Sequence, residues 1–388
     1  MYWLRAAAIQ CVVSRVRKYV KWASEFCFYI LQYQIKKIMD DLTNGNDETD
    51  SLIDSEIDIL PEEIMLEIFK LLPVEAIVEC EGVCQKWRRL ARDTGLWRHI
   101  QIVCSGKTGM TEACEANMEI IKTHSECVRL LKLQYIYNYS IINSVINICP
   151  NLISLELVMC RIGQEFGTDI IKWPKLKKLN LKNSLLLNSK KLDIQFDQFK
   201  YLNYLALSDF GLSPNNCDTL LHCKYLTHIL IEKIRELPLE YTKALILSKQ
   251  DILIAFHIFG CDSIDDHCLF LLSQCPCLKD LAIIRCDLLT DKGLSYLKYL
   301  KNIQHLQIWN NIVFSEINLL KTLSSPNLMK LQSLSLSRIG YISPIIVDVI
   351  SEYYTNLKFL AVYQCPILIY TDYVSQLKSK FKDIVLLY

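Results

Sequence analysis

A short apolar pattern recurs from residue 128 to the C-terminal end of the 388-residue chain. Each copy has apolar residues at positions 1, 4 and 6, as in Leu253, Phe256 and Ile258, while position 9 is Cys, Asn or apolar. The alternation around positions 4 and 6 predicts a short strand, and the stretch before the next copy is long enough for a returning helix. The copies begin 24 to 28 residues apart, at Val128, Leu152, Leu176, Leu202, Leu226, Leu253, Leu278, Ile303, Leu331 and Leu357.

This period is typical of leucine-rich repeats, whose units are about 20–29 residues long. One strand–helix unit cannot bury its apolar face, whereas a stack of units can. We therefore predict an α/β fold in which residues 128–388 form a curved solenoid of about ten repeats, with parallel strands on the concave face and helices on the convex face. The copies near residues 190–250 are the least regular, and Phe381, Ile384 and Leu386 are expected to form a truncated last strand.

Residues 57–103 show helical spacing instead. Ile64, Ile68 and Leu72 recur every four residues, after a proline that can occupy the first helical turn without losing a needed hydrogen bond. Two further helices are predicted over residues 75–80 and 83–93. A helical unit of about 45 residues cannot hide so many apolar side chains internally, so part of its surface should remain available to a partner.

The order and spacing of these residues resemble the F-box: Leu60-Pro61, Ile64, Ile68-Phe69, Leu72-Pro73, Val83-Cys84, Trp87-Arg88 and Leu96-Trp97. The repeats in turn resemble the cysteine-containing leucine-rich repeats that often follow an F-box, with phrases such as Cys275-Pro276-Cys277-Leu278. The F-box resemblance implies docking on the Skp adaptor of a Skp–cullin–F-box ubiquitin ligase, and through it on a cullin. The residues expected to contact the adaptor are Leu60, Pro61, Ile64, Ile68, Phe69, Leu72, Val83 and Trp87.

The concave face of the repeats is the expected binding surface for a target protein. Side chains alternate between the two faces of a strand, so positions 3, 5 and 7 should point away from the core. Phe259, Ile284 and Trp309 occupy position 7 in three successive repeats and should form one exposed apolar row, unless the C-terminal arm or a loop covers it. The expected target-binding residues are His257, Phe259, Asp280, Ile284, His305, Gln307 and Trp309.

The N-terminal 56 residues differ in charge from the rest of the chain. Residues 1–39 contain seven basic residues and one acidic residue, with apolar residues at helical spacing, which predicts a basic amphipathic helix. It could pack on a protein, act as a mitochondrial presequence or lie on a membrane surface, and Met39 could be an alternative start. Residues 40–56 read as an acidic linker, and residues 104–127 as a helical connection to the repeats.

The composition narrows the possible chemistry. A net charge of +1 removes the simplest argument for nucleic-acid binding, and only 11 glycines make a glycine-rich phosphate loop a poor fit. Four of the 17 cysteines (Cys160, Cys261, Cys286 and Cys365) share position 9 of the repeat, which favours a structural role. The sequence contains no paired C-x-x-C or H-x-x-x-H elements of the kind that bind zinc, and it contains no catalytic motif. We therefore expect a non-catalytic intracellular protein without a cofactor.

Two functions follow from these observations. The leading hypothesis is a substrate-recognition subunit of a Skp–cullin–F-box ubiquitin ligase, located in the cytoplasm, the nucleus or both, that holds an unidentified protein target on its repeats. The alternative is a non-catalytic assembly or scaffold protein of the mitochondrion or a membrane surface, which the basic N-terminal segment favours.

Overall fold

The computed structural model describes residues 61–106, 112–187, 191–208, 211–212, 214–234, 237–309, 314–339 and 342–363, together with residues 365, 375 and 379. The chain divides into two compact units, one made of Met1–Cys104 and Glu112–Leu131 and the other of Ser105–Thr111 and Lys132–Tyr388. Segments 1–39 and 40–56, Leu60 and the expected last strand at residues 381–386 lie outside the described residues.

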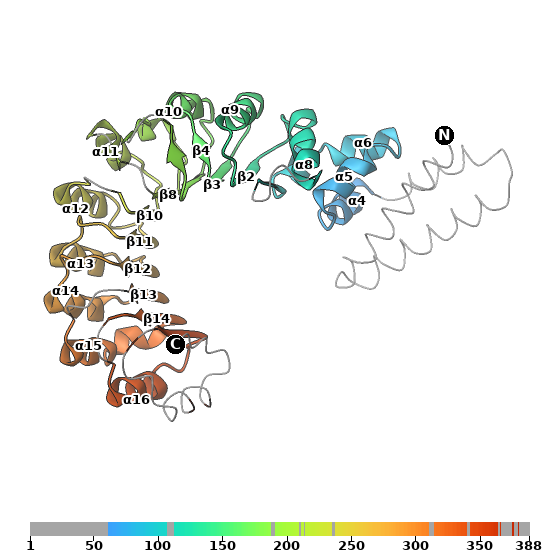
Figure 1. The fold of residues 1–388 in the computed structure, drawn as a ribbon. Helices are drawn as coiled ribbons and strands as arrows, with labels where there is room; N and C mark the ends of the chain where they lie inside the picture. The colour runs from blue at the N-terminus through green and yellow to red at the C-terminus, as the bar shows by residue number, and fades with distance from the viewer. Residues whose placement is uncertain are drawn as a thin grey trace, which may run out of the picture. The chain divides into compact units, whose positions relative to one another are not determined.

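The described part of the first unit is mainly helical (Figure 1). It contains α4 (Glu62–Phe69), α5 (Val74–Cys80), α6 (Gln85–Ala91), α7 (Thr94–Trp97), α8 (Glu112–Thr123) and most of strand β1 (Gln101–Ser105). Pro61 precedes α4, and Glu62 and Glu63 in its first turn complement the positive end of the helix dipole. The Asp93 carboxylate caps α7 by accepting hydrogen bonds from the backbone N–H groups of Gly95 and Leu96. The helices predicted from the apolar spacing are therefore present, and α8 belongs to the same compact unit.

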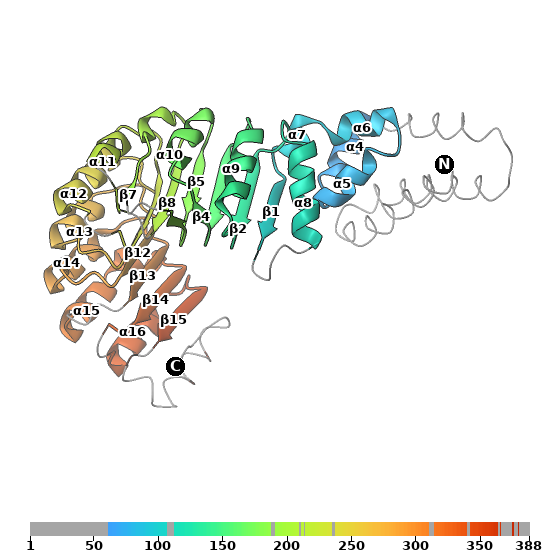
Figure 2. The ribbon, with the colours of Figure 1, turned by 45° about the horizontal axis from the view of Figure 1, so that its top comes forward.

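The second unit is built on a parallel sheet that contains one strand per repeat (Figure 2). Its strands follow one another in chain order: β2 (Leu130–Gln134), β3 (Ser154–Val158), β5 (Lys178–Leu181), β8 (Tyr204–Ser208), β10 (His228–Glu232), β11 (Ala255–Phe259), β12 (Asp280–Ile284), β13 (His305–Trp309), β14 (Ser333–Ser337) and β15 (Phe359–Tyr363). Equivalent positions of successive copies are paired, for example Phe256 with Leu281 and Leu281 with Leu306. The predicted α/β fold with parallel strands is confirmed.

The second unit's helices lie on the side of its sheet away from the concave face (Figures 1 and 2). They are α9 (Tyr139–Ile148), α10 (Phe166–Asp169), α11 (Pro214–Leu221), α12 (Leu239–Ser248), α13 (Asp266–Ser273), α14 (Asp291–Tyr296), α15 (Glu316–Leu323) and α16 (Pro344–Tyr353), with 3-10 turns η2 (Ile170–Lys172), η3 (Phe196–Gln198), η4 (Leu297–Tyr299) and η5 (Pro326–Lys330). Helices α12 to α15 each contact the next helix in sequence. The less regular repeats add short two-stranded pairs: β4 (Arg161–Ile162) with β6 (Leu185–Leu186), and β7 (Lys191–Leu192) with β9 (Gly211–Leu212).

A left-handed residue follows most strands of the sheet. Backbone φ is positive at Tyr135, Met159, Asn183, Lys233, Gly260, Arg285 and Arg338. This conformation costs free energy for residues other than glycine, and a regular hydrogen bond offsets part of that cost. The N–H of Arg285, for instance, donates to the carbonyl of Trp309 at 3.0 Å, and that of Gly260 donates to Ile284 at 2.7 Å. The turn therefore extends the hydrogen bonding between repeats beyond the end of the strand.

The helices of the regular repeats begin at capping side chains. Asp265, Thr290, Ser315 and Ser343 accept hydrogen bonds from N–H groups in the first turns of α13, α14, α15 and α16. The next residue can also connect two repeats, since the Asp266 carboxylate accepts from the N–H of Thr290 at 2.8 Å. Asp291 makes the equivalent contact with the N–H of Ser315 at 2.7 Å. These polar contacts fix where each helix begins relative to the neighbouring repeat.

The cysteine column is structural, as its repeat position predicted. Cys160, Cys261, Cys286 and Cys365 are buried, and each thiol donates to the backbone carbonyl two residues earlier, at 3.3 to 3.6 Å. Burial raises the pKa of the Cys286 thiol to about 12 and that of Cys160 to about 11. Thiols with such pKa values stay protonated near neutral pH, and are therefore poor nucleophiles and metal ligands.

We predict that Gly167→Ala destabilises the second unit. Gly167 lies in α10, and a Cβ at this position would overlap the backbone carbonyl of Asp193. Because this obstacle is backbone, it cannot rotate away, and we expect a loss of about 1–3 kcal/mol in the free energy of unfolding. Urea unfolding of the full chain measures the loss. Gly163→Ala is the matched control, since its Cβ would meet only side chains, with the Glu165 carboxylate nearest at 3.2 Å. Equal midpoints for the two variants would contradict the prediction.

Candidate functional site

The residues expected to contact an adaptor divide into an interior and a surface group. Phe69, Leu72 and Val83 are buried, with exposed fractions of 1%, 7% and 8%. The ring of Phe69 packs edge-on against Trp87 with 5.4 Å between ring centroids, which joins the end of α4 to α6. These three residues thus contribute to the core of the helical unit, and their predicted contact with an adaptor stays a prediction. The Phe69–Trp87 contact holds α4 and α6 against each other.

The surface group includes a residue that the apolar spacing did not select. Pro61 is exposed, Ile68 and Trp87 are half-buried, and Leu71 exposes 44% of its surface. We predict that Pro61, Ile68, Leu71 and Trp87 contact an adaptor, and we call these four residues the adaptor surface. Leu71 lies beside the predicted apolar face of the helix, and the sequence signal for it was a large apolar residue off that face. Leu60 and the side chain of Ile64 lie outside the described residues, so their predicted roles stay predictions.

An ion pair also connects α4 with α6. Arg89 donates through Nη2 to the Glu62 carboxylate, and this hydrogen bond lowers the pKa of Glu62. Both side chains are well exposed, so the pair contributes little to stability. Its consequence is a mixed charged border next to the apolar side chains of the same two helices.

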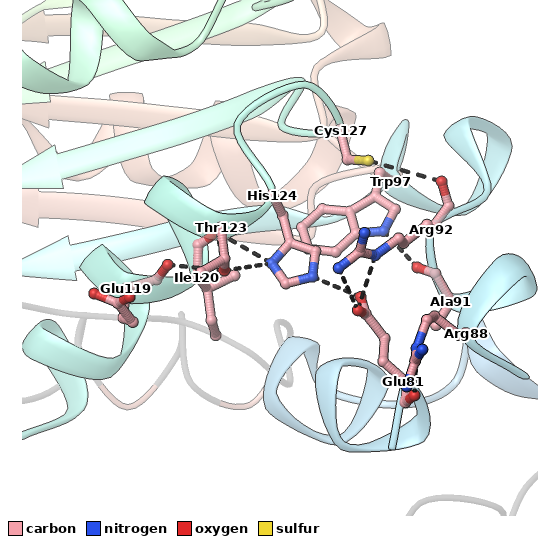
Figure 3. A network of polar contacts seen from close by, with 10 residues as sticks. All are labelled: Glu81, Arg88, Ala91, Arg92, Trp97, Glu119, Ile120, Thr123, His124 and Cys127. Atoms are coloured by element: carbon pink, nitrogen blue, oxygen red, sulfur yellow. Dashed lines mark hydrogen bonds and ion pairs between the residues drawn. The ribbon is translucent and has the colours of Figure 1, made fainter. Parts of the chain in front are cut away.

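A buried polar network fixes α8 to the preceding helices (Figure 3). The Glu81 carboxylate contacts His124 Nε2 at 2.5 Å through one oxygen and accepts a hydrogen bond from Arg92 Nε at 2.8 Å through the other. The other ring nitrogen of His124 lies 2.7 Å from the Thr123 hydroxyl. Glu81 and His124 are both buried. A buried carboxylate is tolerated because both of its oxygens are hydrogen-bonded.

Trp97 completes this network from the side of α7 (Figure 3). Its ring stacks on His124 with 5.1 Å between centroids, and its indole N–H donates to the carbonyl of Ala91 at 2.6 Å. The contact between His124 and Glu81 therefore joins two parts of the helical unit that are 43 residues apart in the sequence. This contact has no signature in the sequence, because neither residue belongs to a recognisable local pattern.

We predict that His124→Ala loosens α8. Removing the imidazole leaves the buried Glu81 carboxylate with one partner fewer, and losing one member of a buried pair commonly costs about 3 kcal/mol or more. Hydrogen exchange measured by mass spectrometry should show loss of protection across α8 and around Glu81. The control is His99→Ala, which removes an exposed histidine of the same unit. Unchanged protection in His124→Ala would show that the network does not hold α8 in place.

On the concave face, the register brings the predicted apolar row together. Ile284 pairs with Phe259 on β11 and with Trp309 on β13. Trp309 is 38% exposed and Phe259 is half-buried, but Ile284 is only 7% exposed, so the expectation of an exposed Ile284 is wrong. The larger side chains of the two neighbouring strands flank it. The row is therefore two accessible aromatic rings with a covered aliphatic side chain between them.

Polar residues surround this row. His257 Nε2 lies 2.9 Å from an Asp280 carboxylate oxygen, and the Trp309 indole N–H donates to the Ser335 hydroxyl at 2.8 Å. The Lys182 ammonium lies 5.3 Å from the centroid of the Phe259 ring, a cation–π geometry. His305 and Gln307 are half-buried on the same face. The structure thus places all seven predicted target-binding residues on strands β11 to β13, and their binding role stays a prediction.

His228 adds a titratable group that the sequence did not indicate. It is half-buried at the start of β10, and burial lowers its pKa. The nearby Asp280 acts in the opposite direction, whereas His257 adds to the lowering. His228 should thus be mainly neutral near pH 7, so that this part of the concave face presents hydrogen-bonding groups and aromatic surface more than positive charge.

Among the described residues, no group of three or more His, Cys, Asp or Glu side chains is arranged to hold a metal ion. No helix in the described parts of the chain has the length and apolarity needed to cross a bilayer.

Comparison with known proteins identifies the helical unit. Residues 57–102 match the F-box-like family, and the F-box prediction is thereby confirmed. F-box/LRR-repeat protein 12 of human and of mouse is 44% identical to this chain over 43 residues, which are 11% of this chain and only 13% of each relative. The crystal structure of the Rad7–Elc1 complex in yeast contains a chain with 12% identity and a TM-score of 0.47, over 89% of this chain and 94% of that one.

Proposed function

We propose that this chain is the substrate-recognition subunit of a Skp–cullin–F-box ubiquitin ligase. An F-box-like domain at residues 57–102 is followed by a parallel-strand repeat solenoid, and this combination is the observation that supports the proposal. The F-box-like domain would bind the Skp adaptor, which in turn binds a cullin. The concave face of the solenoid would bind the target protein.

The proposed contribution to ubiquitination is positional. A target held near a charged ubiquitin-conjugating enzyme meets the thioester at a high effective concentration, which converts a bimolecular encounter into an effectively intramolecular step. The chain itself would supply no reacting group. The thiols of Cys268 and Cys286 are buried and their pKa values are raised to about 12 by burial, which suits packing and not thioester transfer.

The adaptor surface gives the first test of this proposal. A variant with Pro61→Ala and Leu71→Ser removes two exposed apolar contacts without cutting into the buried core around Phe69. Loss of a central apolar contact typically costs about 2 kcal/mol, so we expect at least about tenfold weaker binding to purified Skp adaptor in a titration.

The matched control for the adaptor test is Leu247→Ser. Leu247 lies on α12, exposes 52% of its surface and undergoes the same chemical change far along the repeats in sequence. It should bind the adaptor as tightly as the parent chain. Undiminished binding by the double variant, or an equal loss in the control, would contradict the assignment of the adaptor surface.

The concave aromatic residues give the second test. A variant with Phe259→Ser and Trp309→Ser should keep its adaptor affinity but lose most of the cellular proteins that the parent chain captures and ubiquitinates. Quantitative mass spectrometry of ubiquitinated proteins in cells that express either form measures this loss. Tyr299→Ser is the control, because Tyr299 is an aromatic residue on η4 with 48% exposure. If the double variant ubiquitinates the same proteins as the parent, the concave row is not the recognition site.

A further inference from the structure

A basic groove of about 440 Å³ lies at the edge of the sheet where strands β12 to β15 begin. It is lined by three lysines and four amide side chains: Lys279, Asn302, Gln304, Lys330, Gln332, Asn356 and Lys358. No acidic and no aromatic side chain belongs to this lining. The groove is thus distinct in composition from the concave row, where aromatic and carboxylate side chains meet.

The lining residues come from equivalent positions in four successive repeats. The N–H of Gln304 donates to the carbonyl of Lys279 at 2.7 Å, that of Gln332 to Gln304 at 2.8 Å, and that of Lys358 to Gln332 at 2.8 Å. Lys279, Gln304, Gln332 and Lys358 therefore form one row across the strands. Asn302, Lys330 and Asn356 lie two residues earlier in their repeats and form a second row beside it.

Most of the polar side chains that line the groove have no hydrogen-bond partner among the described residues, although Asn302 Nδ2 donates to the carbonyl of Pro276 at 2.8 Å. The side chains of Lys279, Gln304, Gln332 and Lys358 form no hydrogen bond or ion pair with any residue that the structure describes. Lys330 makes only a long contact, 3.5 Å from its ammonium to the carbonyl of Lys301. The nearest carboxylate in the sequence, Asp280, lies on the concave face and contacts His257. Three positive charges thus face the groove without a described counter-charge.

We propose that this groove binds an extended peptide segment whose side chains carry several negative charges. Adjacent strands are about 4.8 Å apart, so Lys330 and Lys358 lie about 10 and 14 Å from Lys279 along the rows. An extended peptide advances about 3.3 Å per residue. In such a peptide, the fourth and fifth residues lie about 10 and 13 Å from the first. Acidic side chains at these three positions therefore match the spacing of Lys330 and Lys358 from Lys279. The amides can hydrogen-bond to both donors and acceptors of the peptide backbone.

The chemistry of the lining favours a peptide over a nucleic acid. Single-stranded nucleic acid is usually held by aromatic side chains on which its bases stack, and the groove has none. Carboxylates and phosphoryl groups on serine or threonine would supply the same anionic contacts to lysine. That this peptide belongs to a ubiquitination target rests on the proposed function, whereas the binding itself does not.

Fluorescence anisotropy with the full chain tests the groove directly. The labelled probe is Gly-Glu-Ala-Ala-Glu-Glu-Ala-Gly, compared with a version that has phosphoserine at the three glutamate positions and a neutral version that has glutamine there. We expect the glutamate or phosphoserine probe to bind more tightly than the neutral probe at low salt. The triple variant Lys279→Gln, Lys330→Gln, Lys358→Gln should weaken that binding about tenfold, and added salt should weaken it further. Which acidic probe binds more tightly identifies the source of the charge.

A matched charge control separates the groove from the general charge of the chain. Lys175→Gln, Lys200→Gln and Lys224→Gln together remove the same charge from exposed lysines outside the lining, and this variant should bind the probe as the parent does. Three results would overturn the proposal. Neither acidic probe binds more tightly than the neutral probe, or both triple variants lose the same affinity for the acidic probe. The third is a single-stranded RNA of the same charge that binds the groove lysines as tightly as the acidic peptide does. Adaptor binding by the same variants is measured in parallel, so failure of the groove is distinguishable from failure of the ligase assignment.

Discussion

Burial of the apolar side chains between neighbouring repeats is the constraint on which the solenoid depends. Side chains such as Phe256, Leu281 and Leu306 are wholly buried, and the parallel register places them in line on successive strands. A slip of one residue would move every such side chain to the opposite face. The left-handed residue after most strands and the capped helix starts hold the same register by hydrogen bonds, so packing and polar contacts support one arrangement.

The alternation of side chains between the two faces of each strand also creates the candidate binding surfaces. Because positions 4 and 6 of each repeat face the core, positions 3, 5 and 7 line the concave face, where Phe259 and Trp309 remain accessible. The residue just before each strand lies at the edge of the sheet, and its repetition in four repeats produces the basic groove. The helical unit has no such repeat. In it, a buried contact between the Glu81 carboxylate and the His124 imidazole joins elements that are distant in sequence.

Features that depend on local periodicity can be predicted from this sequence, whereas features that depend on tertiary packing cannot. The strands, the cysteine column and the F-box-like helices follow from spacing that is visible in the printed sequence. The burial of Ile284 was missed because it depends on the size of side chains on adjacent strands, and the burial of Leu72 and Val83 because it depends on how short helices pack together. The exposure of Leu71 could not be predicted from the spacing, because this residue lies beside the periodic face. The Glu81–His124 contact and the groove lysines, spread over several repeats, have no local signature.

The central claim is that this chain carries a functional adaptor-binding domain next to a folded solenoid. Size-exclusion chromatography with light scattering, applied to a mixture of the full chain and purified Skp adaptor, tests it most directly. The account predicts a single stable complex that contains one copy of each protein and has a mass equal to the sum of the two. Separate elution of the two proteins at micromolar concentration, with the full chain folded as judged by circular dichroism, would contradict it.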